Sequence, residues 1–223
     1  MKDKKVKSKT KNTSNKSWVH RHLKDGFVKK SQQDGFFSRA AYKLLEINEK
    51  AKLFKPNMIV LDLGAAPGSW SQVASNYIKP KGIIFALDLL ELKDISKINN
   101  IKFFQADINA LTTFELLKEE LNLIDSGSKF DIVMSDMAPS LTGISSVDGA
   151  RMSELLLSSL EIVKNFLNQN GSFVVKLFQG ADFNNQIKNI KLCFESVNIL
   201  KPKASRGESK EVYILAKRLK TIL

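Results

Sequence analysis

Residues that form disulfides or bind metals are scarce in this sequence. Cys193 is the only cysteine among 223 residues, which excludes an internal disulfide framework and any cysteine-rich metal centre. His20 and His22 are the only histidines. We therefore expect no metal site in this protein.

Long apolar stretches are also missing. No apolar run approaches the roughly 18 residues that a membrane-spanning helix needs, and the first residues lack the apolar core of a secretory signal. We therefore expect a cytoplasmic protein without a membrane partner. At 223 residues and 43% hydrophobic content, the chain is long enough for one well-buried α/β domain and too short for two.

Positive charge, in contrast, is abundant and unevenly placed. Lys and Arg number 35 against 23 Asp and Glu, a net charge of +12, which predicts a polyanionic partner such as nucleic acid. Residues 1–35 carry eleven basic and three acidic residues, a net charge of +8, and residues 1–16 have almost nothing apolar to bury. We expect residues 1–35 to form a disordered tail that interacts with RNA, and residues 36–223 to form the folded domain. A solubilising or organelle-targeting tail is the alternative.

From Ser38 onward, helix and strand patterns alternate along the chain. We expect helices at 38–50 with Ser38 as cap, after Pro67, and at 113–121, 149–168 and about 182–190, and strands at 58–63, 83–87, 101–104, 130–135, 172–178, about 193–200 and 211–217. The last two strands have no helix between them, which predicts an antiparallel hairpin at one edge. The fold class is therefore α/β: a Rossmann-like, mostly parallel seven-stranded sheet with helices on both faces.

Ligands of such a sheet bind at the carboxyl ends of its strands, and the first informative end is the glycine-containing turn at residues 61–70. Its small residues let the backbone approach a ligand closely. The spacing differs from the Gly-x-Gly-x-x-Gly of dinucleotide binders, and Pro67 removes an amide that a pyrophosphate would use. This turn favours a ligand without phosphates.

Carboxylates follow the next two strands. Asp88 stands twenty residues after Gly68, where an acidic side chain can accept hydrogen bonds from both ribose hydroxyls of an adenosine. Asp107 follows the third strand, where it can accept from an adenine amino group. Either aspartate alone is also consistent with a solvated loop cap. Their common register with the glycine turn favours a nucleoside site.

The fourth strand end carries Asp136, which would lie beside the reactive group of such a ligand. Lys176 follows on the next strand between apolar neighbours, where burial of an ammonium is costly unless it is paired or neutral. Glu211 opens the last strand, and Lys43 shares a helical face with Arg39. On the residues alone, Lys176, Glu211 and Lys43 could each also be a solvated charge, and Lys176 is the one for which this alternative fits least.

At these residues the chain resembles the FtsJ-like (RrmJ-type) large-subunit ribosomal RNA uridine 2′-O-methyltransferases. The resemblance covers about residues 39–217 and rests on motifs at residues 38–40, 62–72 (DLGAAPGSWSQ), 134–139 (MSDMAP) and 173–180 (FVVKLFQG). It implies that residues 36–223 form a methyltransferase catalytic domain. It also implies a catalytic tetrad and a set of S-adenosyl-L-methionine contacts: Lys43, Asp136, Lys176 and Glu211 for the tetrad, and Gly68, Trp70, Asp88, Asp107 and Asp136 for the cofactor.

The reaction that the resemblance implies is methyl transfer to the ribose 2′-hydroxyl of a uridine in large-subunit (23S-type) ribosomal RNA. The assembled 50S particle is the expected partner, and the protein is expected to be a monomer. In-line displacement depends on alignment, and the hydroxyl must lose its proton to a nearby acceptor. We expect Lys176 to be that base, because burial and the second ammonium of Lys43 favour its neutral form, against the influence of Asp136 and Glu211. Arg39 and Lys43 are expected to contact the RNA backbone.

Other function classes fit the sequence less well. A base-amine methyltransferase is expected to carry an aromatic residue after its Asp/Asn-Pro-Pro motif, whereas Ser140 follows Pro139 here. A cytosine-carbon methyltransferase needs a cysteine nucleophile, and Cys193 lies on a late apolar strand. The remaining alternative is a non-enzymatic ribosome-assembly factor that binds RNA through the same fold.

Overall fold

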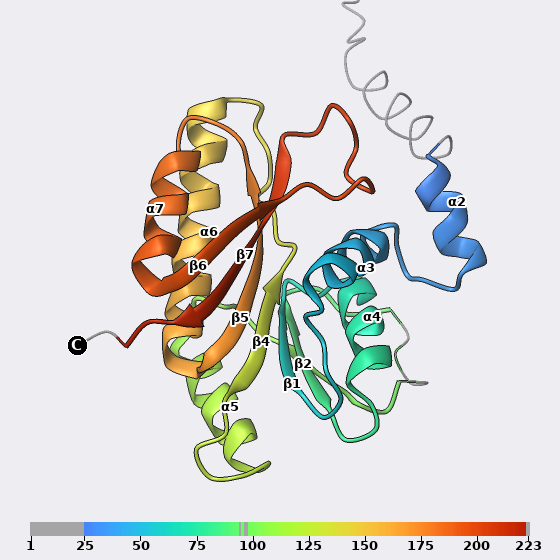
Figure 1. The fold of residues 1–223 in the computed structure, drawn as a ribbon, viewed down its shortest axis with the longest axis vertical. Coiled ribbons are helices and arrows are strands. Elements are labelled where there is room, and N and C mark those ends of the chain that lie inside the picture. The colour runs from blue at the N-terminus through green and yellow to red at the C-terminus, as the bar shows by residue number, and fades with distance from the viewer. Residues whose placement is uncertain (1–24, 94, 96–97, 222–223) are drawn as a thin grey trace, which may run out of the picture.

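The computed structural model describes residues 25–93, 95 and 98–221 (Figure 1). Most of the predicted tail, residues 1–24, lies outside the described residues. Residues 25–35 are described, and Gly26–Gln33 form helix α2, so this part of the expected disordered tail is ordered. Asp25 caps the helix by accepting a hydrogen bond from the Phe27 amide at 3.1 Å, and the Phe27 ring packs on Tyr42.

The remaining helices and strands alternate from residue 40 onward, as the sequence predicts. They are α3 (Ala40–Ala51), β1 (Ile59–Leu63), α4 (Ser69–Ile78), β2 (Ile83–Asp88), β3 (Ile101–Gln105), α5 (Leu111–Asn122), β4 (Phe130–Ser135), α6 (Ser145–Phe166), β5 (Leu167–Phe178), α7 (Phe183–Cys193), β6 (Phe194–Leu200) and β7 (Glu211–Leu219). Within the described part of the chain, no helix has the length and hydropathy needed to cross a membrane.

The strands form one seven-stranded sheet in the order β3-β2-β1-β4-β5-β7-β6. Strands β1 to β5 pair in parallel, whereas β7 pairs antiparallel with both β5 and β6. The predicted doubly wound sheet and its antiparallel edge hairpin are therefore confirmed. Strand β7 enters between β5 and β6, which brings its first residues to the carboxyl end of β5.

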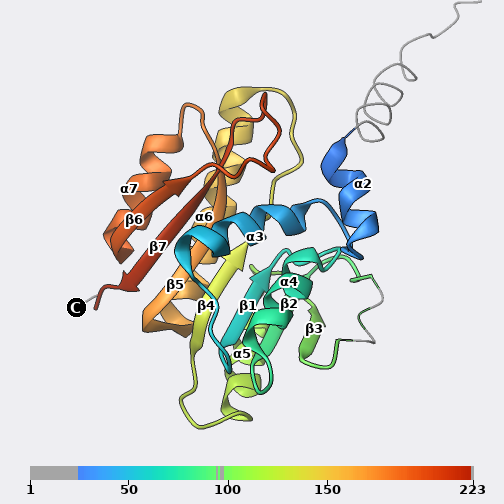
Figure 2. The same cartoon turned by 45° about the vertical axis from the view of Figure 1, so that its right-hand side comes forward.

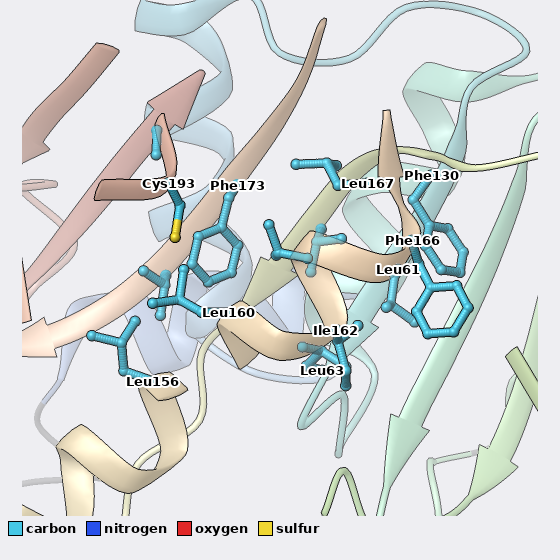
Figure 3. Close-up of a cluster of buried hydrophobic side chains, with 14 of the residues drawn as sticks. Leu61, Leu63, Phe130, Leu156, Leu160, Ile162, Phe166, Leu167, Phe173 and Cys193 are labelled. Atoms are coloured by element: carbon cyan, nitrogen blue, oxygen red, sulfur yellow. The ribbon is translucent and has the colours of Figure 1, made fainter. Parts of the chain in front are cut away.

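Helices cover both faces of the sheet and enclose two apolar layers. Helices α3 and α4 lie on one face, and α5, α6 and α7 lie on the other (Figures 1 and 2). Figure 3 shows the second layer, in which Leu160 and Phe166 of α6 share a buried cluster with Phe130 and Phe173 of the sheet. Hydrophobic burial on both faces thus fixes the strands whose ends carry the polar residues.

Strand β5 alternates between these two layers. Val175 and Leu177 belong to the cluster beneath α6 and α7, and Val174 belongs to the cluster beneath α3 and α4. Because side chains alternate along a strand, Lys176 shares the α3 face with Val174. The strand pattern therefore directs the Lys176 ammonium toward α3, which carries Lys43.

Helix α6 begins at Ser145 and ends at Phe166, a few residues earlier at both ends than the sequence predicts. The Asp148 carboxylate accepts hydrogen bonds from the amides of Thr142 and Gly143 at 2.7 and 3.0 Å, which folds the preceding loop onto the first turn. Helix α3 begins at Ala40, and the Oγ of Ser38 accepts from the Ala40 amide at 3.2 Å. Side-chain hydrogen bonds to the preceding loop or to the first helical amide therefore hold the chain at these two helix starts, although neither N-cap side chain itself caps its helix.

Candidate active site

The turn after β1 depends on glycine. Gly64 and Gly68 have φ angles of +70° and +101°, in the left-handed region that favours glycine. The Gly64 amide donates to the Leu87 carbonyl of β2 at 2.8 Å, which holds the turn against the neighbouring strand. A Cβ on Gly64 would lie 2.1 Å from Cγ of Met137, so only a glycine lets this backbone approach the segment after β4.

Asp88 and Asp107 both lie at the carboxyl edge of the sheet, where the sequence analysis places them. The two Asp88 carboxylate oxygens each accept one amide hydrogen at 2.8 Å, from Ala66 and from Leu90. Asp107 is exposed, and its Oδ1 accepts from the Asn109 amide at 2.9 Å. Asp88 thus links its own loop to the glycine turn, and Asp107 caps its own loop by accepting from both the amide and the side chain of Asn109 through Oδ1. Both Asp88 oxygens and Asp107 Oδ2 keep a lone pair for a ligand.

The four residues of the predicted tetrad meet in one cluster. Lys43 Nζ lies 3.0 Å from Glu211 Oε1 and 3.9 Å from Asp136 Oδ2. Lys176 Nζ lies 3.0 Å from Asp136 Oδ1 and also donates to the Asp136 carbonyl oxygen. The two lysines are 9% and 7% exposed, so these ammonium groups are buried and paired. The alternative of solvated surface charges is therefore wrong for both.

The strand ladder explains how Glu211 and Lys176 come together. In the β5–β7 register Lys176 lies opposite Tyr213, and Phe178 lies opposite Glu211. Residues opposite each other in an antiparallel pair project on the same face. Asp136 follows β4 directly, beside β5, so all the strand-borne residues converge under α3.

Tyr213 is a component of this cluster that the sequence analysis missed. Its hydroxyl donates to Asp136 Oδ1 at 2.7 Å, and its ring is fully buried. Burial raises the pKa of Tyr213 well above its ordinary value, and the nearby Asp136 and Glu211 carboxylates raise it further. Tyr213 therefore remains a neutral donor. Because Tyr213 stands two residues after Glu211 on one strand, the sequence indicates that both side chains project on the same face.

Asp62 is a second buried residue that the predictions from sequence did not include. It lies within β1, fully buried, and its Oδ2 accepts from the Ser71 hydroxyl at 2.7 Å. Burial raises the pKa of Asp62 to about 7, the Ser71 hydrogen bond opposes this, and the Asp136 and Asp88 charges add to it. A lone carboxylate inside an apolar strand was the sequence signal for this group.

Trp70 is buried rather than open to a ligand. Its indole N–H donates to the Ala40 carbonyl at 3.0 Å, and its ring centroid lies 5.6 Å from that of Tyr213. Trp70 thus ties α4 to α3 and supports the tyrosine beside the tetrad. Its contact with a cofactor stays a prediction.

A cleft of about 780 Å³ opens beside Lys43 and Glu211, with Arg39 and Arg206 in its wall. The Asp25 carboxylate pairs with the Arg39 guanidinium and lies 3.3 Å from Nε of Arg206. Burial lowers the pKa of Arg39, and the charge of Arg206 lowers it further. Two arginines beside the tetrad form a surface suited to the phosphates of a polynucleotide.

The residues at the carboxyl edge fit S-adenosylmethionine. The backbone of the turn carries no side chain at Gly64 and Gly68, and the carboxylates of Asp88, Asp107 and Asp136 could accept from hydroxyls or an amino group or face a positive charge. Among the described residues, no three His, Cys, Asp or Glu side chains group into a possible metal site.

Comparison with known proteins gives the family. A model of the FtsJ-like methyltransferases matches residues 36–219. A protein of Cupriavidus pinatubonensis named ribosomal RNA large subunit methyltransferase E is 40% identical over 226 residues, covering 97% of this chain and 99% of its own. One of the same name from Acinetobacter baumannii is 44% identical over 210 residues and 94% of both chains. A solved Plasmodium falciparum structure, described as a ribosomal RNA methyltransferase, has a TM-score of 0.70 and 32% identity, covering 82% of this chain and 98% of its own. The chain belongs to the FtsJ-like methyltransferase family.

Proposed function

We propose that this protein transfers a methyl group from S-adenosyl-L-methionine to the ribose 2′-hydroxyl of a uridine in large-subunit ribosomal RNA. The observation that carries the proposal is the buried cluster in which Asp136 holds Lys176 by both its carboxylate and its carbonyl oxygen. The relatives named ribosomal RNA large subunit methyltransferase E support the same substrate class.

The cofactor supplies an electrophilic methyl carbon bonded to a sulfonium. In the proposed reaction the glycine turn and Asp88 hold the nucleoside, and Asp136 lies between the turn and the acceptor. Bound there, S-adenosyl-L-methionine would supply its methyl group to the ribose oxygen and leave as S-adenosylhomocysteine, while Nζ of Lys176 would accept the hydroxyl proton.

The cluster assists that proton transfer by dividing the charge of Asp136 among several donors. Lys43 Nζ lies 3.9 Å from Asp136 Oδ2, and the Tyr213 hydroxyl donates to Oδ1 at 2.7 Å, the oxygen that also faces Lys176. Because other donors share the Asp136 carboxylate, its attraction for the Lys176 ammonium is weaker than in an isolated ion pair. We propose that Glu211 holds Lys43 in place, since these two groups are 3.0 Å apart.

The direct test uses labelled S-adenosylmethionine and large ribosomal subunits from cells that lack this protein. We expect label in large-subunit RNA, at one uridine whose phosphodiester bond becomes resistant to alkali. Lys176→Ala is the matched control, checked for folding by circular dichroism. Binding of both ligands by the wild type without any turnover would support the assembly-factor alternative.

We further propose that the protein acts as a cytoplasmic monomer on the assembled 50S particle. The cleft wall formed by Arg39 and Arg206 supports an RNA-bearing partner but does not distinguish free RNA from a particle. Rates on protein-free RNA and on intact subunits distinguish them, and analytical ultracentrifugation gives the oligomeric state. A faster rate on protein-free RNA would contradict the particle assignment.

A further inference from the structure

A pocket of about 370 Å³ lies beyond the end of β5, apart from the cleft that Lys43 and Glu211 line. It lies between the first turns of α6 and α7, at the end of the sheet where the loop before β7 also runs (Figures 1 and 2). Phe178, Phe183, Met152 and Leu141 contribute apolar walls. The volume falls within the range of small-ligand pockets, about 300–1,000 Å³.

Gln186 contributes an unused acceptor to this pocket. The residue is 2% exposed, and its Nε2 donates to the Ser153 hydroxyl at 3.0 Å and lies 3.4 Å from the Gly149 carbonyl oxygen. Its Oε1 is buried and has no hydrogen-bond partner among the described residues. A buried acceptor without a donor is unfavourable, so an occupant that brings an N–H or O–H would be favoured.

The charges around the pocket exclude an anionic occupant. Asp148 and Asp182 line it, and both would repel a phosphate or a carboxylate. Lys210 is the basic residue of its lining and is exposed. Aromatic walls, nearby carboxylates and a buried amide acceptor together suit a flat, neutral ring that carries an N–H donor.

The pocket adjoins the tetrad through Phe178. This residue stands two positions after Lys176 on β5, and its ring centroid lies 5.9 Å from Lys176 Nζ. It also pairs with Glu211 in the β5–β7 ladder. In a nucleotide, the carbon that bears the base is bonded to the carbon that bears the 2′-hydroxyl. A hydroxyl placed at Lys176 therefore puts its own base within reach of Phe178.

We propose that this pocket receives the uracil base of the target nucleotide, with Gln186 Oε1 accepting a hydrogen bond from its N3–H. The proposal rests on the function proposed above and deepens it. Phe178 and Phe183 provide the apolar contact that an unstacked base requires. Cytosine has an acceptor at N3, which would face the Gln186 oxygen without a proton between them. Gln186 thus selects uridine over cytidine.

The first experiment measures methyl transfer to reconstituted large subunits that carry either uridine or cytidine at the target position. We expect the wild type to prefer uridine by at least about tenfold, as sites that hydrogen-bond a substrate donor discriminate against analogues that lack it. Gln186→Leu should lower the rate on uridine about tenfold and leave the rate on cytidine unchanged. Gln169→Leu, an exposed glutamine at the other end of β5, is the matched control. Undiminished preference for uridine in folded Gln186→Leu overturns the proposal.

A second experiment needs no variant and separates failure of the pocket from failure of the proposed function. RNA with 4-thiouridine at the target position is irradiated on the wild-type protein in the presence of S-adenosylhomocysteine, and the crosslinked peptide is identified by mass spectrometry. We expect the crosslink within residues 178–186. A crosslink confined to residues 36–43 or 201–208, outside the lining of this pocket, overturns the pocket even where methylation occurs. Absence of methylation on every RNA contradicts the proposed function. The position of the crosslink then still shows whether the base binds in this pocket.

Discussion

Lys176 Nζ lies 3.0 Å from Asp136 Oδ1 and donates a second hydrogen bond to the carbonyl oxygen of the same residue. One residue at the end of β4 thus fixes the amine of the neighbouring strand through both its side chain and its backbone. The Lys176 side chain lies on the face of the sheet that α3 covers, near the carboxyl end of β5. This arrangement gives the proposed base its position before any substrate binds.

Removal of the Asp88 carboxylate should weaken cofactor binding. Asp88→Ala takes away the acceptor proposed for the ribose hydroxyls, at a cost of about 1.5–3 kcal/mol in binding free energy. Isothermal titration with S-adenosylmethionine measures this loss, with Asp125→Ala on an exposed loop as the control. Unchanged affinity in a folded Asp88→Ala protein would remove this residue from the cofactor site.

Tyr213→Phe tests the hydroxyl that the tetrad shares. The change removes the 2.7 Å hydrogen bond to Asp136 and keeps the buried ring. Because hydrogen bonds to charged groups contribute about 1.5–3 kcal/mol, we expect the methyl-transfer rate to fall roughly tenfold to a hundredfold, with near-normal cofactor affinity. Tyr77→Phe, at an exposed tyrosine, is the control. A rate within twofold of the wild type would show that the Tyr213 hydroxyl does not assist methyl transfer and that the ring serves only in packing.

Asp62 should make stability depend on pH. Its pKa is about 7 in the folded protein and near 3.8 in the unfolded chain, so between these values the folded state holds one more proton. Stability from this group is complete below pH 3.8 and is lost as pH rises to 7, by at most about 1.4 kcal/mol per pH unit. Asp62→Asn should remove this component. Urea unfolding of both proteins from pH 4 to pH 8 measures it, and parallel curves would contradict the assignment.

The basic residues 1–16 are predicted to add salt-sensitive attraction to RNA. Deleting them removes seven lysines and one aspartate. If about half of these lysines contact phosphates, the slope of log affinity against log salt should flatten by roughly 2 to 3. Filter binding to ribosomal RNA between low and physiological salt gives both slopes. Equal slopes for the two proteins would leave this segment without a role in RNA binding.

The sheet and its edge hairpin could be predicted because each depends on a local pattern, whereas the grouping of the four tetrad residues was implied by the resemblance to the family. Apolar strands mark buried parallel pairs, and parallel strands bring their carboxyl ends together. The tetrad roles themselves came from the family motifs rather than from the pattern. For Lys43 in particular, the helical pattern by itself favours a surface position over a buried one.

Contacts between distant segments could not be predicted. Asp25 lies beside Arg206, far away along the chain, and nothing in either local sequence indicates this ion pair. The early start of α6 depends on Asp148 reaching back to the Thr142 amide, a loop geometry that hydrophobic periodicity does not describe. Strand alternation places Tyr213 on the same face as Glu211. Its contact with Asp136 could be known only from the register of β5 and β7.

The most direct test of the account is the pH dependence of single-turnover methyl transfer by the wild type and by Lys176→Arg. Arginine keeps the positive charge but does not give up its proton at accessible pH. We predict a wild-type rate that rises with pH, because a base accepts a proton only in its unprotonated form, and an arginine variant that binds cofactor, loses on the order of 10² to 10⁴ in rate and lacks this rising limb. Near-normal activity of Lys176→Arg with an unchanged pH profile would contradict the account and leave Lys176 as a positioning charge.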